Sequence, residues 1–197
     1  MRALRPAIVL IAVFTVLTGL IFPIAFSGVA TTVVPGVANG SIIERDGKPI
    51  GSALIGQNFT SDRYFHPRPS ATLDTDPNDS TKTIPSPYNA DNSAGSNLAP
   101  SSKALIDRVT GDVKAIGSTT PVPGDMVTTS ASGLDPDISP DNAMLQVARV
   151  AKARGLPEDR VRALVDEHVT GRLFGLFGQP RVNVLSLNLA LDQLKVS

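Results

Sequence analysis

The feature that most constrains this chain is a long segment without charge. No Asp, Glu, Lys or Arg occurs between Arg5 and Glu44. The first part of the segment, Ala7 to Phe26, is 20 residues of predominantly apolar sequence. A helix rises about 1.5 Å per residue, so this part would be about 30 Å long, which matches the hydrocarbon core of a bilayer. The sequence therefore predicts one transmembrane helix close to the N-terminus.

The charges that flank the span predict its orientation. Arg2 and Arg5 precede it, and the first basic residue after it is Arg45. Because basic residues favour the cytoplasmic side, we expect residues 1–34 to form a cytoplasmic N-terminus and a transmembrane helix. Residues 35–197 would then be an extracytoplasmic (periplasmic) soluble domain of a protein of the cell (inner) membrane.

A cleaved secretory signal is the alternative interpretation. Gly28 and Ala30 would supply the small residues of a cleavage site. A signal usually has an apolar core of only about 7–15 residues, however, and this one is longer. The length favours a retained anchor, and in either case the soluble part is exported.

The composition of residues 35–197 excludes several functions. These residues number enough for one domain, and they carry 18 acids and 16 bases, a net charge of −2. That balance gives no electrostatic reason to expect a nucleic-acid partner. The sequence has no cysteine, which excludes disulfides, thiol catalysis and thiolate metal sites.

Periodicity and turn signals predict an α+β fold. It consists of a single N-terminal transmembrane helix and one exported domain with a β-hairpin or small sheet and three or four helices. A β-hairpin is expected over residues 41–55 around Asp46-Gly47, a pair suited to a type I′ turn. The other expected elements are a long loop over 66–100, a helix from Ser101 or Ser102 to Ile116, a strand near 126–129, helices over 140–154 and 157–170, and a strand that passes into a helix after Asn183.

The sequence offers little for catalysis, so we expect no enzyme activity, no catalytic residue and no metal site. His168 falls on the apolar face of an expected helix, where a packed histidine is the simpler interpretation. His66 lies in an aromatic and cationic cluster, but no G-x-S-x-G elbow supplies a nucleophile. No H-E-x-x-H motif or pair of histidines at ligand spacing supports zinc.

One segment begins like a phosphate-binding loop. Gly51 and Gly56 have the required separation, but Gln57 and Asn58 replace the lysine and the Ser/Thr that bind phosphate and magnesium. The simpler interpretation is the end of a strand with a glycine bulge. The phosphorylation sequence Asp-Lys-Thr-Gly-Thr of P-type ATPases is also missing from the chain. Any ATPase activity would therefore belong to a partner.

Two features suggest partner proteins. Thr15 and Gly19 form a small-x-x-x-small pair that lets another helix approach, and Pro23 would kink the span near its outer end. Both features are also compatible with a lone helix in lipid. In the domain, the long polar loop with Tyr64, Phe65 and Tyr88 and the Asn/Ser-rich segment 89–97 has amides and aromatic residues typical of a contact surface, although a solvated loop has the same composition.

Several motifs together resemble a known family, the C subunit (KdpC) of bacterial Kdp potassium-transporting ATPases. The resemblance covers essentially the whole chain. The motifs are Gly-x-x-x-Ile-Gly-Gln-x-Phe at 51–59, Tyr-Phe-x-x-Arg-Pro-Ser at 64–70, Tyr-Asn-x-x-x-Ser-x-Gly-Ser-Asn at 88–97, the segment 129–140, the helix 148–154 and the segments 182–185 and 188–192.

The resemblance implies a non-catalytic accessory subunit of an ATP-driven, high-affinity potassium uptake complex. Its partners would be a P-type ATPase subunit, which hydrolyses ATP, and a channel-like subunit that translocates potassium. The C subunit of such complexes acts as a catalytic chaperone that raises the ATP affinity of the P-type subunit and stabilises the assembly. The cofactor would be ATP, through the complex, and the family links its binding to the glutamine that is Gln57 here.

The predicted topology conflicts with direct binding of ATP at Gln57. If Arg2 and Arg5 hold the N-terminus inside, Gln57 lies outside, where cytoplasmic ATP does not reach it. We therefore expect an effect on ATP affinity to pass through the membrane helices. The alternative function is a free-standing, membrane-anchored exported binding protein, which would purify alone and work without its anchor.

Overall fold

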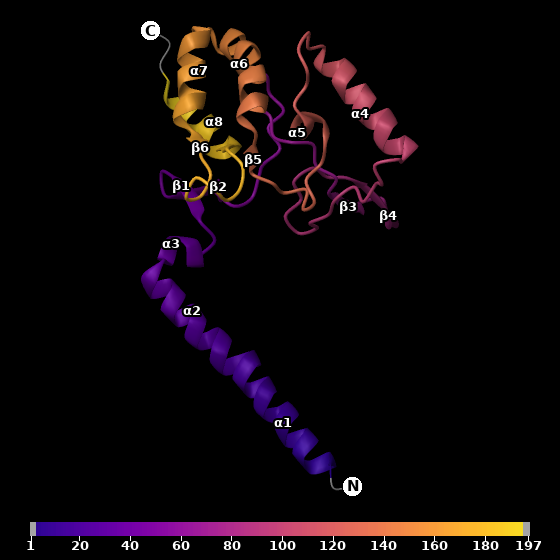
Figure 1. Cartoon of the computed structure of the whole chain (residues 1–197), viewed down its shortest axis with the longest axis vertical. Coiled ribbons are helices and arrows are strands. Elements are labelled where there is room, and N and C mark those ends of the chain that lie inside the picture. Colours follow the sequence, from indigo (N-terminus) through magenta and orange to yellow (C-terminus); the bar gives the residue numbers. More distant parts are fainter. Residues whose placement is uncertain (1–2, 195–197) are drawn as a thin grey trace. The chain divides into compact units, whose positions relative to one another are not determined.

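The computed structural model describes residues 3–194 and divides the chain into two compact units. The anchor unit ends at Ser52, and the C-terminal unit begins at Ala53 (Figure 1). The anchor unit contains the apolar helix and one β-hairpin, and the C-terminal unit contains small sheets and several helices. This is the mixed α+β fold that the sequence predicts, with one apolar N-terminal helix.

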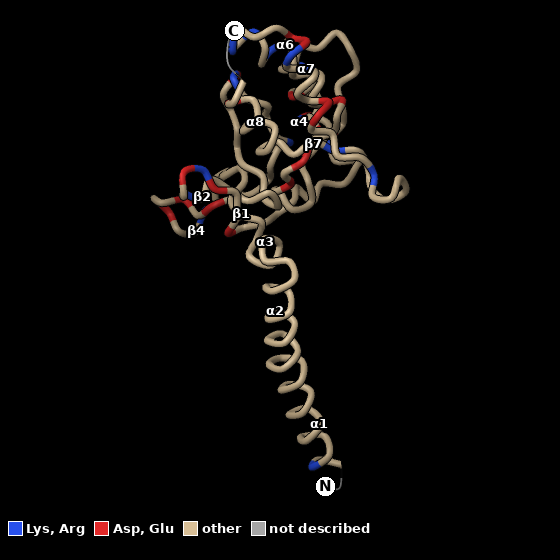
Figure 2. Tube along the Cα trace, turned by 90° about the vertical axis from the view of Figure 1, so that its left-hand side faces the viewer, with Lys and Arg blue, Asp and Glu red and all other residues tan. Residues whose placement is uncertain are grey.

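The apolar helix runs without interruption from Leu4 to Val33, over 30 residues. It consists of α1 (Leu4–Val16), a π-helical segment η1 (Leu17–Ile21) and α2 (Phe22–Val33), and a short helix α3 (Pro35–Ala38) follows. Its length and composition are sufficient to cross a membrane, and its apolar side chains are exposed. Beyond Arg5 the helix carries no charge (Figure 2). Arg2, on which the orientation also depends, lies outside the described residues.

The helix accommodates Pro23 by local widening. Proline has no backbone N–H to donate to the preceding turn. In η1 the N–H of Phe22 bonds to the carbonyl of Leu17, five residues earlier, in place of the usual four. Thr18 adds a bond from its hydroxyl to the carbonyl of Phe14, at 2.6 Å. A π-helical segment thus lies just before the proline, and the kink expected at Pro23 stays a prediction.

The hairpin of the anchor unit is confirmed. Strands β1 (Ile42–Arg45) and β2 (Lys48–Ser52) pair in antiparallel fashion. At the turn, Asp46 and Gly47 have φ angles of 53° and 72°, as a type I′ turn requires. Ile43 pairs with Gly51 and the next residue, Glu44, pairs with Pro49, so the register skips Ile50. The strand β2 therefore has an irregular register before its end.

The core of the C-terminal unit is a helical hairpin packed with a third helix. The hairpin is α6 (Pro140–Arg154) and α7 (Glu158–Glu167), and the third helix is α8 (Val184–Gln193). A three-stranded antiparallel sheet lies beside them, in the order β5 (Asp137–Ile138), β7 (Arg181–Asn183), β6 (Val169–Thr170). The buried core side chains are Phe65, Ile138, Ala143, Val147, Val150, Ala151, Leu156, Val161, Leu164, Val165, Val182, Val184, Leu187 and Leu191.

Local sequence signals set most helix ends. Ser139 caps α6 through a bond from the N–H of Asn142, and Gly155 ends the helix in the left-handed conformation. Asn183 caps α8 in the same way, through the N–H of Ser186. Helix α4 (Lys103–Ile116) also ends at a left-handed glycine, Gly117. The predicted helices 102–116 and 140–154 and the strand-to-helix passage at Asn183 are confirmed.

The expected long loop over 66–100 is wrong in its middle. Strands β3 (Leu73–Asp76) and β4 (Asp79–Pro85) form a second hairpin there. Nearly all of their side chains are partly or fully exposed, so the hairpin lacks the alternating apolar pattern by which strands are recognised.

Two other boundaries differ from the prediction. The expected strand near 126–129 is wrong: residues Gly124–Val127 form one helical turn, α5, in which the N–H of Met126 bonds to the carbonyl of Pro123. The strand was expected because Val127 and Thr128 are β-branched, a side-chain type that favours strands. The helix expected over 157–170 ends at Glu167, because Val169 and Thr170 pair with β7 as strand β6.

Candidate functional site

The chain segment at Phe65 and His66 is fixed by two side-chain amides. Asn188, on α8, accepts from the N–H of Phe65 at 2.8 Å and donates to its carbonyl at 3.0 Å. Gln146, on α6, makes the same pair of bonds with His66, at 2.7 and 3.1 Å. A neighbouring β-strand would use the same donors and acceptors, so this amide clamp gives an irregular segment the bonds that a sheet would supply.

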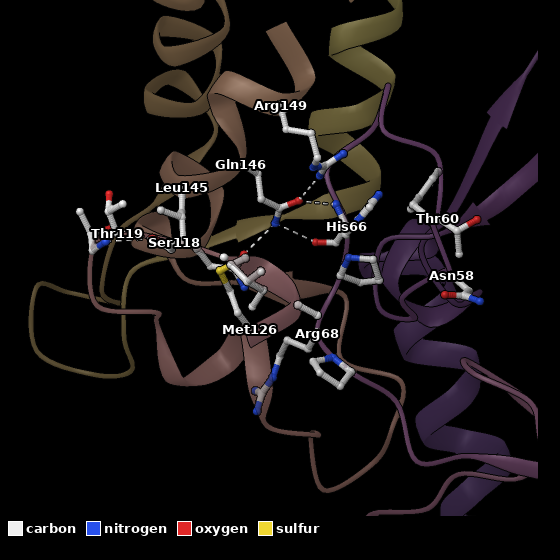
Figure 3. A pocket seen from close by; sticks show the side chains of 18 residues that line it. Asn58, Thr60, His66, Arg68, Ser118, Thr119, Met126, Leu145, Gln146 and Arg149 are labelled. Carbon is white, nitrogen blue, oxygen red and sulfur yellow. Dashed lines mark hydrogen bonds between the residues drawn. The ribbon is translucent and has the colours of Figure 1, made fainter. Parts of the chain in front are cut away.

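A cleft with a volume of about 910 Å³ opens beside this segment (Figure 3). Its walls are the segment 58–60, residues 66–69, the end of α4 with the turn after it, and one face of α6. Gln146 stands at its centre in Figure 3, bonded to His66, Arg149 and Asn142. The polar groups of this wall are therefore largely bound to one another.

The surroundings of His66 favour the neutral form of its imidazole ring. Its Nε2 lies 3.1 Å from the carbonyl oxygen of Ser61, so the ring contacts a backbone acceptor and not a serine hydroxyl. Burial, reinforced by the positive charge of Arg149, lowers the pKa of His66 below its ordinary value of 6.5. A neutral imidazole bonded to a carbonyl fits a structural role better than that of a base beside a nucleophile.

The family-like motifs meet at a second point, around Arg68. Its guanidinium forms an ion pair with Asp135, at 2.9 Å, and approaches the carbonyl oxygens of Thr128 and Thr129. Segments 64–70 and 129–140 are distant in sequence, and this ion pair joins them. These bonds hold segments 64–70 and 129–140 in place relative to each other, although neither segment contains a long strand or helix at this point.

Tyr88 and Ser70 complete this group, which we call the Arg68 cluster (Arg68, Ser70, Tyr88, Asp135). The Tyr88 hydroxyl donates to the carbonyl of Arg68 at 2.8 Å, and the Ser70 hydroxyl donates to the carbonyl of Gly133 at the same distance. Burial, and then the nearby Asp135 carboxylate, raise the pKa of Tyr88. The phenol therefore remains a hydrogen-bond donor at neutral pH.

Two glycines let these loops approach one another closely. A Cβ atom on Gly56 would lie 2.4 Å from the Tyr88 ring and 2.7 Å from the carbonyl oxygen of Asp135. One on Gly133 would lie 2.6 Å from Thr72, and Gly133 has a φ of +68°. Only glycine fits both positions, which explains two of the glycines in the family-like motifs.

The Asn/Ser-rich segment 88–97 bonds largely to its own chain. Asn89 and Asn92 both donate their side-chain amides to the carbonyl of Leu73, at 2.9 Å. The N–H of Ala94 bonds to the carbonyl of Ser132 at 3.0 Å. These amides fasten the loop to β3 and to segment 129–135, and its role as a contact surface stays a prediction.

Gln57 lies between the two sites. It is half-buried, its carbonyl accepts from the N–H of Phe59 at 3.0 Å, and its neighbour Asn58 lines the cleft. Gln57 itself is not one of the residues that line the cleft. Gly56, on its other side, donates its N–H to the carbonyl of Leu134, the neighbour of Asp135 in the Arg68 cluster, at 2.9 Å.

His168 caps the end of α7 and lies away from the cleft. Its Nδ1 is 2.8 Å from the carbonyl oxygen of Leu164. Within residues 3–194, no three His, Asp or Glu side chains are grouped so that they could hold a metal ion. Each of the two histidines thus has a ring nitrogen near a backbone carbonyl oxygen.

The structure thus defines a class of protein: a chain with one membrane-length apolar helix and an α+β unit whose polar loops are fixed by side-chain bonds. The family model described as "KdpC: K+-transporting ATPase, c chain" matches residues 4–193. The chain belongs to this KdpC family.

Similar proteins agree with the family model. The chain is 62% identical over 196 residues to a protein of Bradyrhizobium diazoefficiens, with 98% of each chain covered. It is 62% identical over 198 residues to one of Rhodopseudomonas palustris, covering 99% of this chain and all of that one. A third, from Methylorubrum populi, is 58% identical over 194 residues, covering 97% of this chain and 96% of its own. Each of these relatives is named "Potassium-transporting ATPase KdpC subunit".

Sequence reasoning identified the motifs but not their contacts. It gave no role to Asn188 or Gln146, since a buried amide in a helix has no periodic signal of its own. It also passed over segment 172–179, where Leu173, Phe174, Leu176 and Phe177 are strongly exposed. The signal was present there as Leu-Phe-Gly-Leu-Phe, four large apolar residues around a glycine.

Proposed function

We propose that this chain is an accessory, non-catalytic subunit of an ATP-driven potassium uptake complex. In that role it stabilises the assembly and raises the ATP affinity of a P-type subunit. One observation carries the proposal: a K+-transporting ATPase family matches residues 4–193 of a chain that lacks the Asp-Lys-Thr-Gly-Thr phosphorylation sequence. Its partners would be the P-type subunit and a channel-like, potassium-translocating subunit.

Co-purification from native membranes tests this proposal. A tagged chain should bring down a multi-span ATPase in mild detergent, and its loss should raise the KM for ATP of the remaining complex. A chain that purifies alone and keeps its function after removal of residues 1–34 would instead be a free-standing exported binding protein.

The anchor helix is proposed to contact a partner helix through its small residues. Ala12, Thr15 and Gly19 lie on one side of the helix, and close approach of helices in membranes requires such side chains. Ala12→Leu should therefore reduce co-purification. Ala7→Leu makes the same enlargement on another face of the helix and is the matched control. Equal losses from both variants would argue against a specific helix contact.

We further propose that the C-terminal unit lies outside the cytoplasm. Arg5 precedes the apolar helix, and no basic residue follows until Arg45. In this topology Gln57 does not meet cytoplasmic ATP, and the effect on ATP affinity passes through membrane helices.

A cysteine at position 57 tests the topology without background, because the native chain has no cysteine. A membrane-impermeant maleimide should label Gln57→Cys in intact cells whose outer membrane is permeable. Protection there, with labelling only in inverted vesicles, would reverse the proposed orientation and restore direct contact between Gln57 and ATP.

A further inference from the structure

The segment that joins β6 to β7 follows β6 in the yellow-orange part of the chain (Figure 1). Its tip is strongly apolar in sequence. We call residues 173–177 the apolar tip. Its four large apolar side chains are strongly exposed: Leu173 by 62%, Phe174 by 84%, Leu176 by 74% and Phe177 by 65%. Residues on either side of it in sequence, Val165 and Val182, are buried in the core. Large apolar side chains gathered so openly usually mark a surface that is covered in the working protein.

The apolar tip has a defined backbone conformation. Leu173 and Phe177 form an antiparallel bridge, and Phe174 and Gly175 have φ angles of 53° and 73°. A phenylalanine in the left-handed region is strained, and such strain tends to persist where function requires it. The turn therefore presents Phe174 outward in a fixed conformation.

Four of the five backbone N–H groups of the apolar tip are bonded within residues 172–177. The N–H of Leu173 bonds to the carbonyl of Phe177, and the N–H of Phe177 bonds back to Leu173, at 2.9 and 3.0 Å. Gly175 and Leu176 donate to the carbonyls of Arg172 and Leu173, at 3.0 and 3.1 Å. This condition matters in lipid, where an unpaired N–H has no water to bind.

The polar residues at the base of the apolar tip fit a headgroup layer. Arg172 donates to Gln179 at 2.9 Å across the base, and no charged residue lies between Arg172 and Arg181. About two or three residues on each arm, at about 3.3 Å each, give a tip about 7–10 Å long. Interfacial segments bury their apolar side to about that depth, with basic side chains left among the phosphates.

The unit that carries the apolar tip is tethered to a membrane-length helix. Ala53 follows Val33 by 20 residues, which span at most about 70 Å when fully extended. The C-terminal unit therefore stays tethered to a bilayer whenever the apolar helix spans the membrane. This condition holds on either side of the membrane and does not depend on the proposed partners.

From these observations we infer that residues 173–177 insert into the lipid of the adjacent leaflet. Lipid is favoured over a protein groove for two reasons. Large apolar residues occupy four of the five positions of the turn, whereas binding in the groove of a partner protein needs only one apolar face. Internal bonding of backbone N–H groups, which four of the five tip residues show, favours entry into lipid, whereas a protein partner can supply its own acceptors.

Tryptophan fluorescence tests the insertion directly, because the native chain has no tryptophan. The full chain with Phe174→Trp is reconstituted into phosphatidylcholine vesicles with and without dibrominated acyl chains. We expect a blue-shifted emission that bromine near the headgroups quenches more than bromine near the bilayer centre. Leu176→Trp, also in the tip, should behave alike and serves if Phe174→Trp does not fold.

Two control positions make the result decisive. Phe14→Trp in the apolar helix should be quenched and reports that the chain is inserted. Ile106→Trp, on α4 and 54% exposed, should emit as in water and should not be quenched. Quenching at position 14 without quenching at 174 and 176 would overturn the inference.

The assembled complex supplies the last arm of the test. With its partner subunits present, the tryptophan at 174 should still be quenched by brominated lipid. A blue-shifted emission that brominated lipid does not quench would mean that protein covers the tip. That result would overturn lipid insertion and assign the tip to a subunit interface, and it would leave the accessory function intact.

Discussion

Removal of the Asn188 side chain should destabilise the C-terminal unit by several kilocalories per mole. Asn188 is 1% exposed and makes both bonds to the backbone of Phe65, itself fully buried. Asn188→Ala leaves that N–H and that carbonyl without partners, at about 1–3 kcal/mol each. The sum is about 2–6 kcal/mol, and a water in the vacated space would bring it toward the lower end.

Urea unfolding of the full chain in non-ionic detergent, followed by circular dichroism, measures this cost. With a slope of about 2 kcal/mol per molar urea, the midpoint should fall by about 1–3 M. Asn92→Ala is the matched control, because Asn92 is exposed and makes one bond to Leu73. Its effect should stay within about 0.5 kcal/mol. An equal, small shift for both variants would refute the idea that the amide clamp holds the Phe65 segment.

Three further outcomes follow from individual contacts. Ser139→Ala removes the cap that accepts from Asn142 and should lower the free energy of unfolding by about 1 kcal/mol, measured by the same titration; no change would assign the helix start to Pro140 alone. Gly56→Ala places a Cβ against the Tyr88 ring and should lower the melting temperature and expose that tyrosine to acrylamide quenching; an unchanged melt would show that the loops can separate freely. Burial lowers the pKa of His66, so the unfolded chain binds a proton near pH 6.5 while the folded chain resists. Stability should be full well above pH 6.5 and should fall as the pH drops below it; His66→Gln should flatten this slope, whereas an unchanged slope would assign it to other groups.

The sequence predicted those parts of the fold that carry a local signal. The capping residues Ser139 and Asn183 and the glycines after α4 and α6 fix helix ends by short-range bonds, and Asp46-Gly47 fixes its turn. The hairpin β3–β4 had no such signal, because its side chains face solvent on nearly every position. Where burial does not alternate, strand periodicity disappears.

The candidate site was predictable only as a set of motifs. Arg68 and Asp135 are 67 residues apart, and their ion pair depends on how the loops fold back over the core. Gly56 and Gly133 were visible as glycines, but the side chains that exclude a Cβ there come from other segments. Such long-range contacts leave no spacing that one sequence alone can reveal.

The bonds between the beginning and the end of the C-terminal unit also constrain how it is made. Asn183 donates to the carbonyl of Ala53 across 130 residues, and Asn188 holds Phe65 across 123. During synthesis the first part of the unit therefore cannot form these bonds until the end of the chain has been translated, because its partners are translated last. Segment 53–66 lacks these bonds until α8 has emerged, and a nascent chain that ends before Asn183 would lack both of them.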